Sequence, residues 1–212
     1  MTDILSLDDL FRMEMDQLEK EHGRDPDPDS WRWSPSDIRL WDEMLRTAYN
    51  YYRETDSHSR GPICIWEAGS GIGTKLYRAK HEYNMIEYGF ERFDYYVAAA
   101  HELGVACEQR DLSDLDDQPA WEVPDIVFTA RPFKDDLLEV KWEQLIQDRM
   151  RPGTVLISTF TARKPYGWTV LYRATFRGVW VKPDTSPDEP ESVQRAVTRS
   201  LYVSVPAGKP TR

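Results

Sequence analysis

The sequence predicts an α/β fold, a three-layer sandwich in which helices cover both faces of a mostly parallel sheet. From Ile63 onward, short apolar runs typical of buried strands alternate with helical segments. The first run leads directly into a turn with three glycines, and a carboxylate follows the second run. Strands and helices that alternate in this order form parallel sheets with right-handed crossovers.

Two helical segments precede the first expected strand. The first ends near Gly23, and its apolar residues have helical spacing at Leu7, Leu10, Phe11, Met15 and Leu18. The prolines between Asp25 and Asp29 then require an extended chain. The second helix begins with Ser34 as the N-cap and Pro35 at the first helical position. One face of this helix is formed by Ile38, Trp41, Met44, Leu45, Ala48 and Tyr52.

The first strand, from Ile63 to Ala68, contains Glu67 near its end and is followed by alternating glycines at 69, 71 and 73. Residues without a Cβ atom allow backbone N–H groups to approach a ligand closely. A phosphate-binding P-loop is excluded, because Gly73 is followed by Thr74 and only then by Lys75. The spacing also weakens a dinucleotide fingerprint, which has Gly-x-Gly-x-x-Gly.

The second strand, Met85–Phe90, places Glu91 at its end, 18 residues after Gly73. A carboxylate in this position of a doubly wound fold can accept hydrogen bonds from both ribose hydroxyls of a nucleoside. A helix over Asp94–Gly104 follows, with helix-forming alanines and a terminal glycine. The third strand, Val105–Arg110, leads into Asp111 and Leu112.

The remaining elements are a fourth strand at Pro124–Ala130 and a fifth strand, with its preceding turn, at Met150–Ser158. Trp168, Leu171 and Tyr172 have helical spacing and predict a helix over Tyr166–Thr175. Two final strands are expected at Phe176–Lys182 and, after an acidic, proline-rich loop, at Arg199–Val205.

The acidic-x-Gly-x-Gly-x-Gly turn, together with Glu91 and Asp111, resembles the class I S-adenosylmethionine-dependent methyltransferases. The resemblance spans roughly Ile63 to Val205, but its specific motifs end near Asp111. It implies a Rossmann-like, seven-stranded sheet with an antiparallel C-terminal hairpin, S-adenosylmethionine as the cofactor, and methyl transfer as the reaction. It also implies that Glu67 lies near the methionine amino group of the cofactor and that Asp111 lies near its adenine. The residues expected to bind the cofactor are Glu67, Gly69, Ser70, Gly71, Gly73, Glu91, Arg92, Asp111 and Leu112.

The segment after the fourth strand reads Ala130-Arg131-Pro132-Phe133. Relatives that methylate an exocyclic amino group of a base have Asp, Asn or Ser, then Pro-Pro and an aromatic residue, so the first polar group is missing here. Methylation at C5 of cytosine needs a cysteine after this strand, and the chain has none there. Arg131 can instead clamp a carboxylate or phosphate, and Phe133 can stack on a planar substrate.

The catalytic residue is unknown at this stage, since aligned in-line displacement needs no acid–base apparatus. For a hydroxyl or amine acceptor, the candidates to remove its proton are Asp135, Asp136 and His101. Arg131 is a further candidate for the site, unless it pairs with Asp135 or Asp136. Two alternatives stay open: a domain that binds S-adenosylmethionine without catalysis and acts as an interaction subunit, and a nicotinamide-dependent oxidoreductase. No metal site is expected.

At 212 residues the chain is long enough for one compact domain, with residues 1–60 as a helical extension and 61–212 as the methyltransferase-like part. In the family, such N-terminal additions often form a lid; the alternative is that both helices only cover the sheet. The net charge of −10 argues against a general nucleic-acid-binding surface. However, residues 129–212 hold 14 basic and 9 acidic side chains, so an anionic acceptor, including nucleic acid, is one option. Without an export signal or membrane span, the expected location is the cytoplasm, and the oligomeric state is unknown.

Overall fold

The computed structural model describes residues 7–22, 38–55, 61–159, 165–174 and 177–184. The helices are α1 (Leu7–His22), α2 (Ile38–Thr55), α3 (Thr74–Tyr83), α4 (Asp94–Glu102) and α5 (Asp136–Arg149). The strands are β1 (Cys64–Ala68), β2 (Ile86–Glu91), β3 (Cys107–Gln109), β4 (Ile126–Thr129), β5 (Val155–Thr159), β6 (Thr169–Ala174) and β7 (Arg177–Val181).

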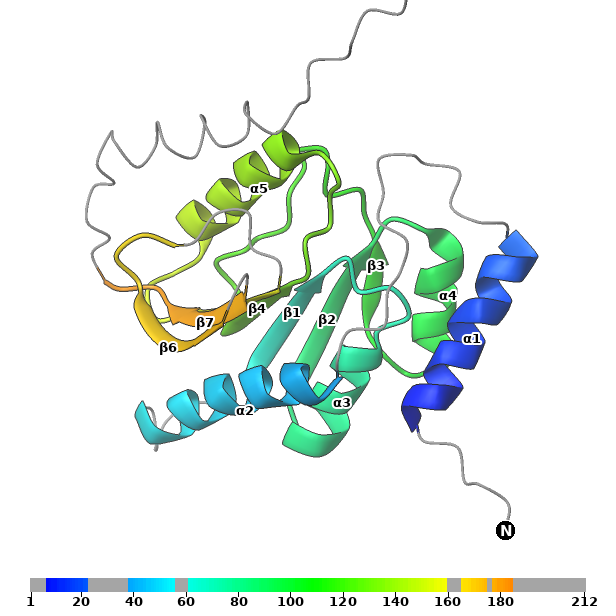
Figure 1. The fold of residues 1–212 in the computed structure, drawn as a ribbon, viewed down its shortest axis with the longest axis horizontal. Coiled ribbons are helices and arrows are strands. Elements are labelled where there is room, and N and C mark those ends of the chain that lie inside the picture. Colours follow the sequence, from blue (N-terminus) through cyan, green and yellow to red (C-terminus); the bar gives the residue numbers. More distant parts are fainter. Residues whose placement is uncertain (1–6, 23–37, 56–60, 160–164, 175–176, 185–212) are drawn as a thin grey trace, which may run out of the picture.

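The seven strands form one sheet in the order β3-β2-β1-β4-β5-β7-β6 (Figure 1). The first five are parallel to one another, whereas β7 is antiparallel to both β5 and β6. The strand order reverses between β1 and β4, and ligands of open α/β sheets bind outside the carboxyl ends of the strands at such a point. The predicted fold class is therefore confirmed, including the antiparallel hairpin.

Two apolar clusters fill the two faces of the sheet because side chains alternate along each strand. Ile65 and Phe128 belong to the cluster under α2, α3 and α4, which also contains Met44, Leu76 and Val97. Ala68 and Val127 belong to the cluster under α5, together with Trp142, Ile146 and Met150. The strands read as nearly continuous apolar runs because both faces are covered.

The two N-terminal helices have different neighbours. The buried face of α2 carries Trp41, Met44 and Leu45 into the main core, as the sequence predicts. α1 lies outside α4 (Figure 1), and its Phe11 and Met15 pack with Ile72, Tyr96 and Ala99. The expected cap at Ser34 and Pro35 lies outside the described residues. Within the described ranges, every helix is too short or too polar to cross a bilayer.

β3 is shorter than the expected strand Val105–Arg110, because it pairs with β2 over only three residues, Cys107–Gln109. Cys64 and Cys107 lie in β1 and β3, and β2 separates these strands in the sheet. Both cysteines are free.

The prediction of a helix over Tyr166–Thr175 is wrong, because Thr169–Ala174 forms strand β6. β6 pairs with β7, and a bulge between Val170 and Tyr172 shifts its register. A bulge inserts one residue and breaks the alternation of a strand, which here produced an apolar spacing like that of a helix. The closing hairpin is thus β6 with β7, and the strand expected at Arg199–Val205 lies outside the described residues.

Candidate functional site

The glycine turn joins β1 to α3 at the carboxyl edge of the sheet. Gly69, Gly71 and Gly73 have φ angles of 70°, 55° and 76°, a backbone conformation that residues with a Cβ rarely adopt. The N–H groups of Gly69 and Ser70 both donate to the carbonyl oxygen of Phe90, at 2.9 and 3.0 Å. The turn is therefore tied to the end of β2, where Glu91 follows.

A fourth glycine, which the sequence reasoning missed, makes room for this turn. A Cβ atom on Gly89 in β2 would lie 2.5 Å from Oγ of Ser70 and 2.8 Å from its Cβ. Only a residue without a side chain lets the turn settle on β2 so closely. The signal in the sequence was a glycine inside an expected strand, which marks a close approach of another segment.

Glu91 is at the end of β2, as predicted, and its carboxylate holds the glycine turn. Oε2 accepts a hydrogen bond from the N–H of Gly71 at 2.9 Å, and Oε1 accepts from the N–H groups of Arg92 and Phe93. The side chain is buried, and burial raises the pKa of Glu91 although these three donors oppose the shift. Oε1 already accepts two bonds, whereas Oε2 accepts one and has a second acceptor site that could still receive a ribose hydroxyl.

Glu67 is completely buried beneath the same turn. Its Oε1 pairs with Nζ of Lys75 at 2.9 Å, and this ammonium also lies 5.1 Å from the centre of the Phe128 ring. Burial raises the pKa of Glu67, and Lys75 opposes the rise. Among the described residues, Oε2 of Glu67 has no hydrogen-bond partner. A buried carboxylate oxygen without a donor is costly and is a ready place for a ligand N–H group.

The other expected cofactor residues lie at the ends of β2 and β3. Nε of Arg92 is 3.6 Å from Oδ2 of Asp111, and both side chains are about half exposed. Leu112 is buried in the cluster that contains Phe90 and Trp121. The structure thus brings all the sequence-predicted cofactor residues to the carboxyl ends of β1, β2 and β3; their roles in binding stay predictions.

The segment between β4 and α5 lies against the glycine turn, since a Cβ atom on Gly69 would be 3.7 Å from Cβ of Pro132. Arg131 has a φ of 58° and pairs with Asp136, which decides between the two partners considered from the sequence. Asp135 caps α5, and its Oδ1 accepts from the N–H groups of Leu137 and Leu138. Asp135 and Asp136 are therefore both engaged within this segment.

His101, the remaining candidate base, lies in α4, and its Nε2 is 2.8 Å from the carbonyl oxygen of Cys107. The structure does not bring it to the segment after β4. A different acid does lie there: Glu139, in the first turn of α5, is fully buried, and its Oε2 accepts from the N–H of Phe133 at 2.9 Å. Burial raises the pKa of Glu139 to about 7. The sequence reasoning missed it.

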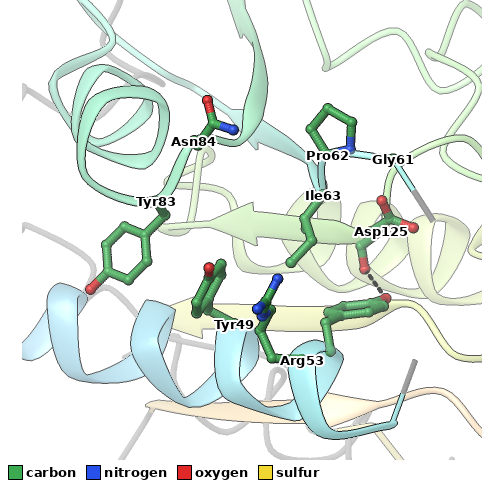
Figure 2. Close-up of a pocket in the computed structure, with 9 residues that line it drawn as sticks. Tyr49, Arg53, Gly61, Pro62, Ile63, Tyr83, Asn84 and Asp125 are labelled. Atoms are coloured by element: carbon green, nitrogen blue, oxygen red, sulfur yellow. Dashed lines mark hydrogen bonds between the residues drawn. The ribbon is translucent and has the colours of Figure 1, made fainter. Parts of the chain in front are cut away.

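A cavity of about 160 Å³ opens at the opposite edge of the sheet, where the strands begin. Figure 2 shows Tyr49 and Arg53 from α2, Tyr83 from the end of α3, and Ile63 and Asp125 from the starts of β1 and β4. None of the expected cofactor residues lines it. The cavity is thus separate from the glycine turn.

Comparison with known proteins rests on the fold. No protein-family model matches the chain, and no curated protein sequence matches it. The structure resembles an RNA methyltransferase from Salinibacter ruber in complex with S-adenosyl-L-homocysteine, with a TM-score of 0.52 and 21% identity over 74% of this chain and 98% of that one. A methyltransferase from Geobacter sulfurreducens gives a TM-score of 0.44 and 17% identity over 79% and 58% of the two chains. The plantazolicin methyltransferase BpumL gives 0.45 and 14% over 71% and 53%.

The chain has the fold of the class I S-adenosylmethionine-dependent methyltransferases. Its seven-stranded sheet, the antiparallel β7 and the glycine turn after β1 agree with what the resemblance in the sequence implies.

Proposed function

We propose that this protein binds S-adenosylmethionine at the glycine turn and transfers its methyl group to an acceptor held beside the segment between β4 and α5. The observation that carries the proposal is the glycine turn fixed by the Glu91 carboxylate through the N–H of Gly71. S-adenosylmethionine supplies an electrophilic methyl group on a sulfonium centre. The protein residues have to hold and orient that group, exclude water and handle the proton of the acceptor.

The donor groups around the turn fit this cofactor. Glu67 offers a buried oxygen without a partner among the described residues, suited to the methionine amino group. Oε2 of Glu91 retains an acceptor site that suits a ribose hydroxyl, and the half-exposed Asp111 lies near the buried Leu112, where an adenine could rest. The proximity of Pro132 to Gly69 supports an acceptor site next to the proposed cofactor site.

The test is calorimetric titration of the full chain with S-adenosylmethionine, with S-adenosylhomocysteine and, separately, with NADH. We expect both adenosyl ligands to bind and NADH not to bind. Binding should be abolished by Gly71→Arg, which fills the turn, and weakened by Glu91→Ala. Tight binding of NADH instead would contradict the proposal and favour an oxidoreductase.

A matched pair of glycine variants separates ligand binding from backbone strain. Gly69 and Gly153 have φ angles of 70° and 82°, and an added Cβ would meet no atom closer than 3.7 Å at the first and none within 4 Å at the second. We expect Gly69→Ala and Gly153→Ala to destabilise the fold similarly, by about 1 kcal/mol. Only Gly69→Ala should weaken S-adenosylhomocysteine binding, by about tenfold or more. Equal affinities in the two variants would remove the glycine turn as the binding site.

A non-catalytic cofactor-binding subunit is the second candidate, because Ala130 stands where amino-directed relatives have their acceptor-gripping residue, and the following Arg131 is paired with Asp136. Formation of S-adenosylhomocysteine from S-adenosylmethionine only when a pool of acceptors is present would favour the enzyme. Binding without such turnover would favour the subunit. The acceptor, the cytoplasmic location and the domain division at residue 60 stay predictions.

A further inference from the structure

Glu139 has the features of a group built for a ligand. Its side chain is 0% exposed, although glutamate is rarely buried without partners. Oε2 accepts one hydrogen bond, from the N–H of Phe133. Oε1 is buried and has no hydrogen-bond partner among the residues that the structure describes. The carboxyl group therefore carries an unused acceptor in a place where water does not reach it.

A second unsatisfied group lies on the same side of the sheet. Thr129 is the last residue of β4 and is 1% exposed. Val127 packs in the cluster under α5, so Thr129, two residues further along the strand, faces the same side. Its Oγ1 is also buried without a partner within the described ranges. Thr129 directly precedes the segment 130–133 in the chain and Glu139 accepts from the N–H of Phe133 within it, while Pro132 of the same segment lies against Gly69 of the glycine turn.

We propose that Oε1 of Glu139 receives the N–H or O–H of the methyl acceptor and takes its proton during transfer. This inference rests on the proposed function. As the bond between the acceptor atom and the methyl carbon forms, the bond from that carbon to sulfur breaks and its electron pair stays on the sulfur. The proton of the acceptor atom passes to Glu139 and leaves to water once product release opens the site to solvent.

The proposal restricts the chemistry of the acceptor. A buried carboxylate repels an anionic nucleophile, so the reacting atom is a nitrogen or oxygen that bears a proton, and a carboxylate oxygen is disfavoured. The basic side chains of the C-terminal half can then contact other parts of an anionic acceptor, away from the reacting atom.

The protonation state of Glu139 suits this role. Burial raises the pKa of Glu139, Arg131 lowers it and Asp136 raises it. The resulting pKa is about 7. General bases work best when their pKa lies near the working pH. A side chain that only accepted the Phe133 N–H would not need a pKa near neutrality, since a glutamine could supply the same acceptor oxygen.

The experiment uses phenol and benzoate as probes. They share an aromatic ring, but phenol carries an O–H donor whereas benzoate carries an anionic carboxylate. Each is titrated by NMR into the full chain saturated with S-adenosylhomocysteine, at a series of pH values around neutrality. The glutamate side-chain carboxyl carbons are isotope-labelled, and Glu139→Gln assigns the signal of Glu139. Glu143→Gln, at a buried glutamate one turn further along α5, is the matched control.

We expect phenol to shift the Glu139 signal and to lower its pKa, because a donor binds the charged form preferentially. Phenol affinity should then rise with pH through that pKa, and benzoate affinity should fall. Glu139→Gln keeps an oxygen for Phe133 and should retain S-adenosylhomocysteine affinity, but lose the pH dependence and about tenfold in phenol affinity. Glu143→Gln should behave as the unmodified chain does.

Phenol binding that leaves the Glu139 signal unchanged, or that is equal in Glu139→Gln, would overturn this inference while S-adenosylhomocysteine binding still supports the proposed function. The absence of phenol binding to the S-adenosylhomocysteine complex would overturn it as well. If S-adenosylhomocysteine itself does not bind, the proposed function fails and this inference falls with it.

Discussion

Replacing Lys75 by methionine should lower the free energy of unfolding by about 3–5 kcal/mol, because it leaves the carboxylate of Glu67 buried without its counter-charge. Glu67 is 0% exposed and Lys75 is 9% exposed, so water cannot take over the role of the ammonium group. The lost contact is the 2.9 Å ion pair between Nζ and Oε1. Urea unfolding followed by circular dichroism measures the change.

Two further variants identify the cause of this loss. Glu67→Leu combined with Lys75→Met removes both charges and should recover most of the stability, since apolar replacements of buried pairs are often neutral. Arg92→Met breaks the exposed pair with Asp111 and should change the stability by less than about 1 kcal/mol. A double variant no more stable than Lys75→Met would show that shape, and not charge, dominates at this position.

The effect of Lys75→Met should depend on pH in a defined direction. Burial raises the pKa of Glu67 in the folded chain above its unfolded value, and loss of Lys75 raises it further. The folded state then binds more protons than the unfolded state, so stability falls as the pH rises between the two pKa values. The loss in free energy of unfolding caused by Lys75→Met should therefore be smallest in acid and largest above the folded-state pKa of Glu67.

The second large effect is expected for Gly89→Ala, which should weaken S-adenosylhomocysteine binding roughly ten- to hundredfold. The new methyl group would lie 2.5 Å from Oγ of Ser70, and overpacking of this kind costs about 1–3 kcal/mol. The strain is relieved when the glycine turn moves away from β2, and this movement displaces the turn at which we propose that the cofactor binds. Calorimetric titration measures the affinity.

A suppressor and a matched control sharpen this prediction. Ser70→Gly removes both atoms nearest to the added methyl, leaving Cδ1 of Leu76 at 3.0 Å, so Ser70→Gly with Gly89→Ala should regain part of the affinity. Gly178→Ala in β7 creates a similar clash, 2.5 Å from the Trp180 ring, far from the turn. It should lower stability without changing affinity. If Gly178→Ala weakens binding as much as Gly89→Ala does, general destabilisation explains both.

The sequence predicted those features that residue types impose on the local backbone. The glycines at 69, 71 and 73 indicated a turn, and all three have positive φ angles. The apolar runs located the five parallel strands because both faces of these strands are covered. β6 was missed because its bulge replaced the alternation of a strand by helical spacing. Local pattern carries no direct information on where a strand will pair.

In the candidate site, the residues of the proposed cofactor side were easier to predict from the sequence than those of the proposed acceptor side. Glu91 was expected at the end of β2 and lies there, since its position follows from strand length and the preceding turn. Glu139 was missed because a glutamate in the first turn of a helix usually faces solvent and interacts with the helix dipole. Its burial depends on how α5 docks on the sheet, and the choice of Arg131 between two adjacent acids depends on the backbone at Arg131 itself.

The packing of α1 on Ile72 links the N-terminal helix to the turn at which we propose that the cofactor binds. Ile72 lies between Gly71 and Gly73, so the packing of its side chain against α1 holds this part of the turn in position. Any ligand that binds the docked turn more tightly than a loosened one also stabilises the docking of α1, and by the same free energy docked α1 tightens the ligand. Through this reciprocity, a helix that contributes no expected ligand contact of its own would share control of the occupancy of the site.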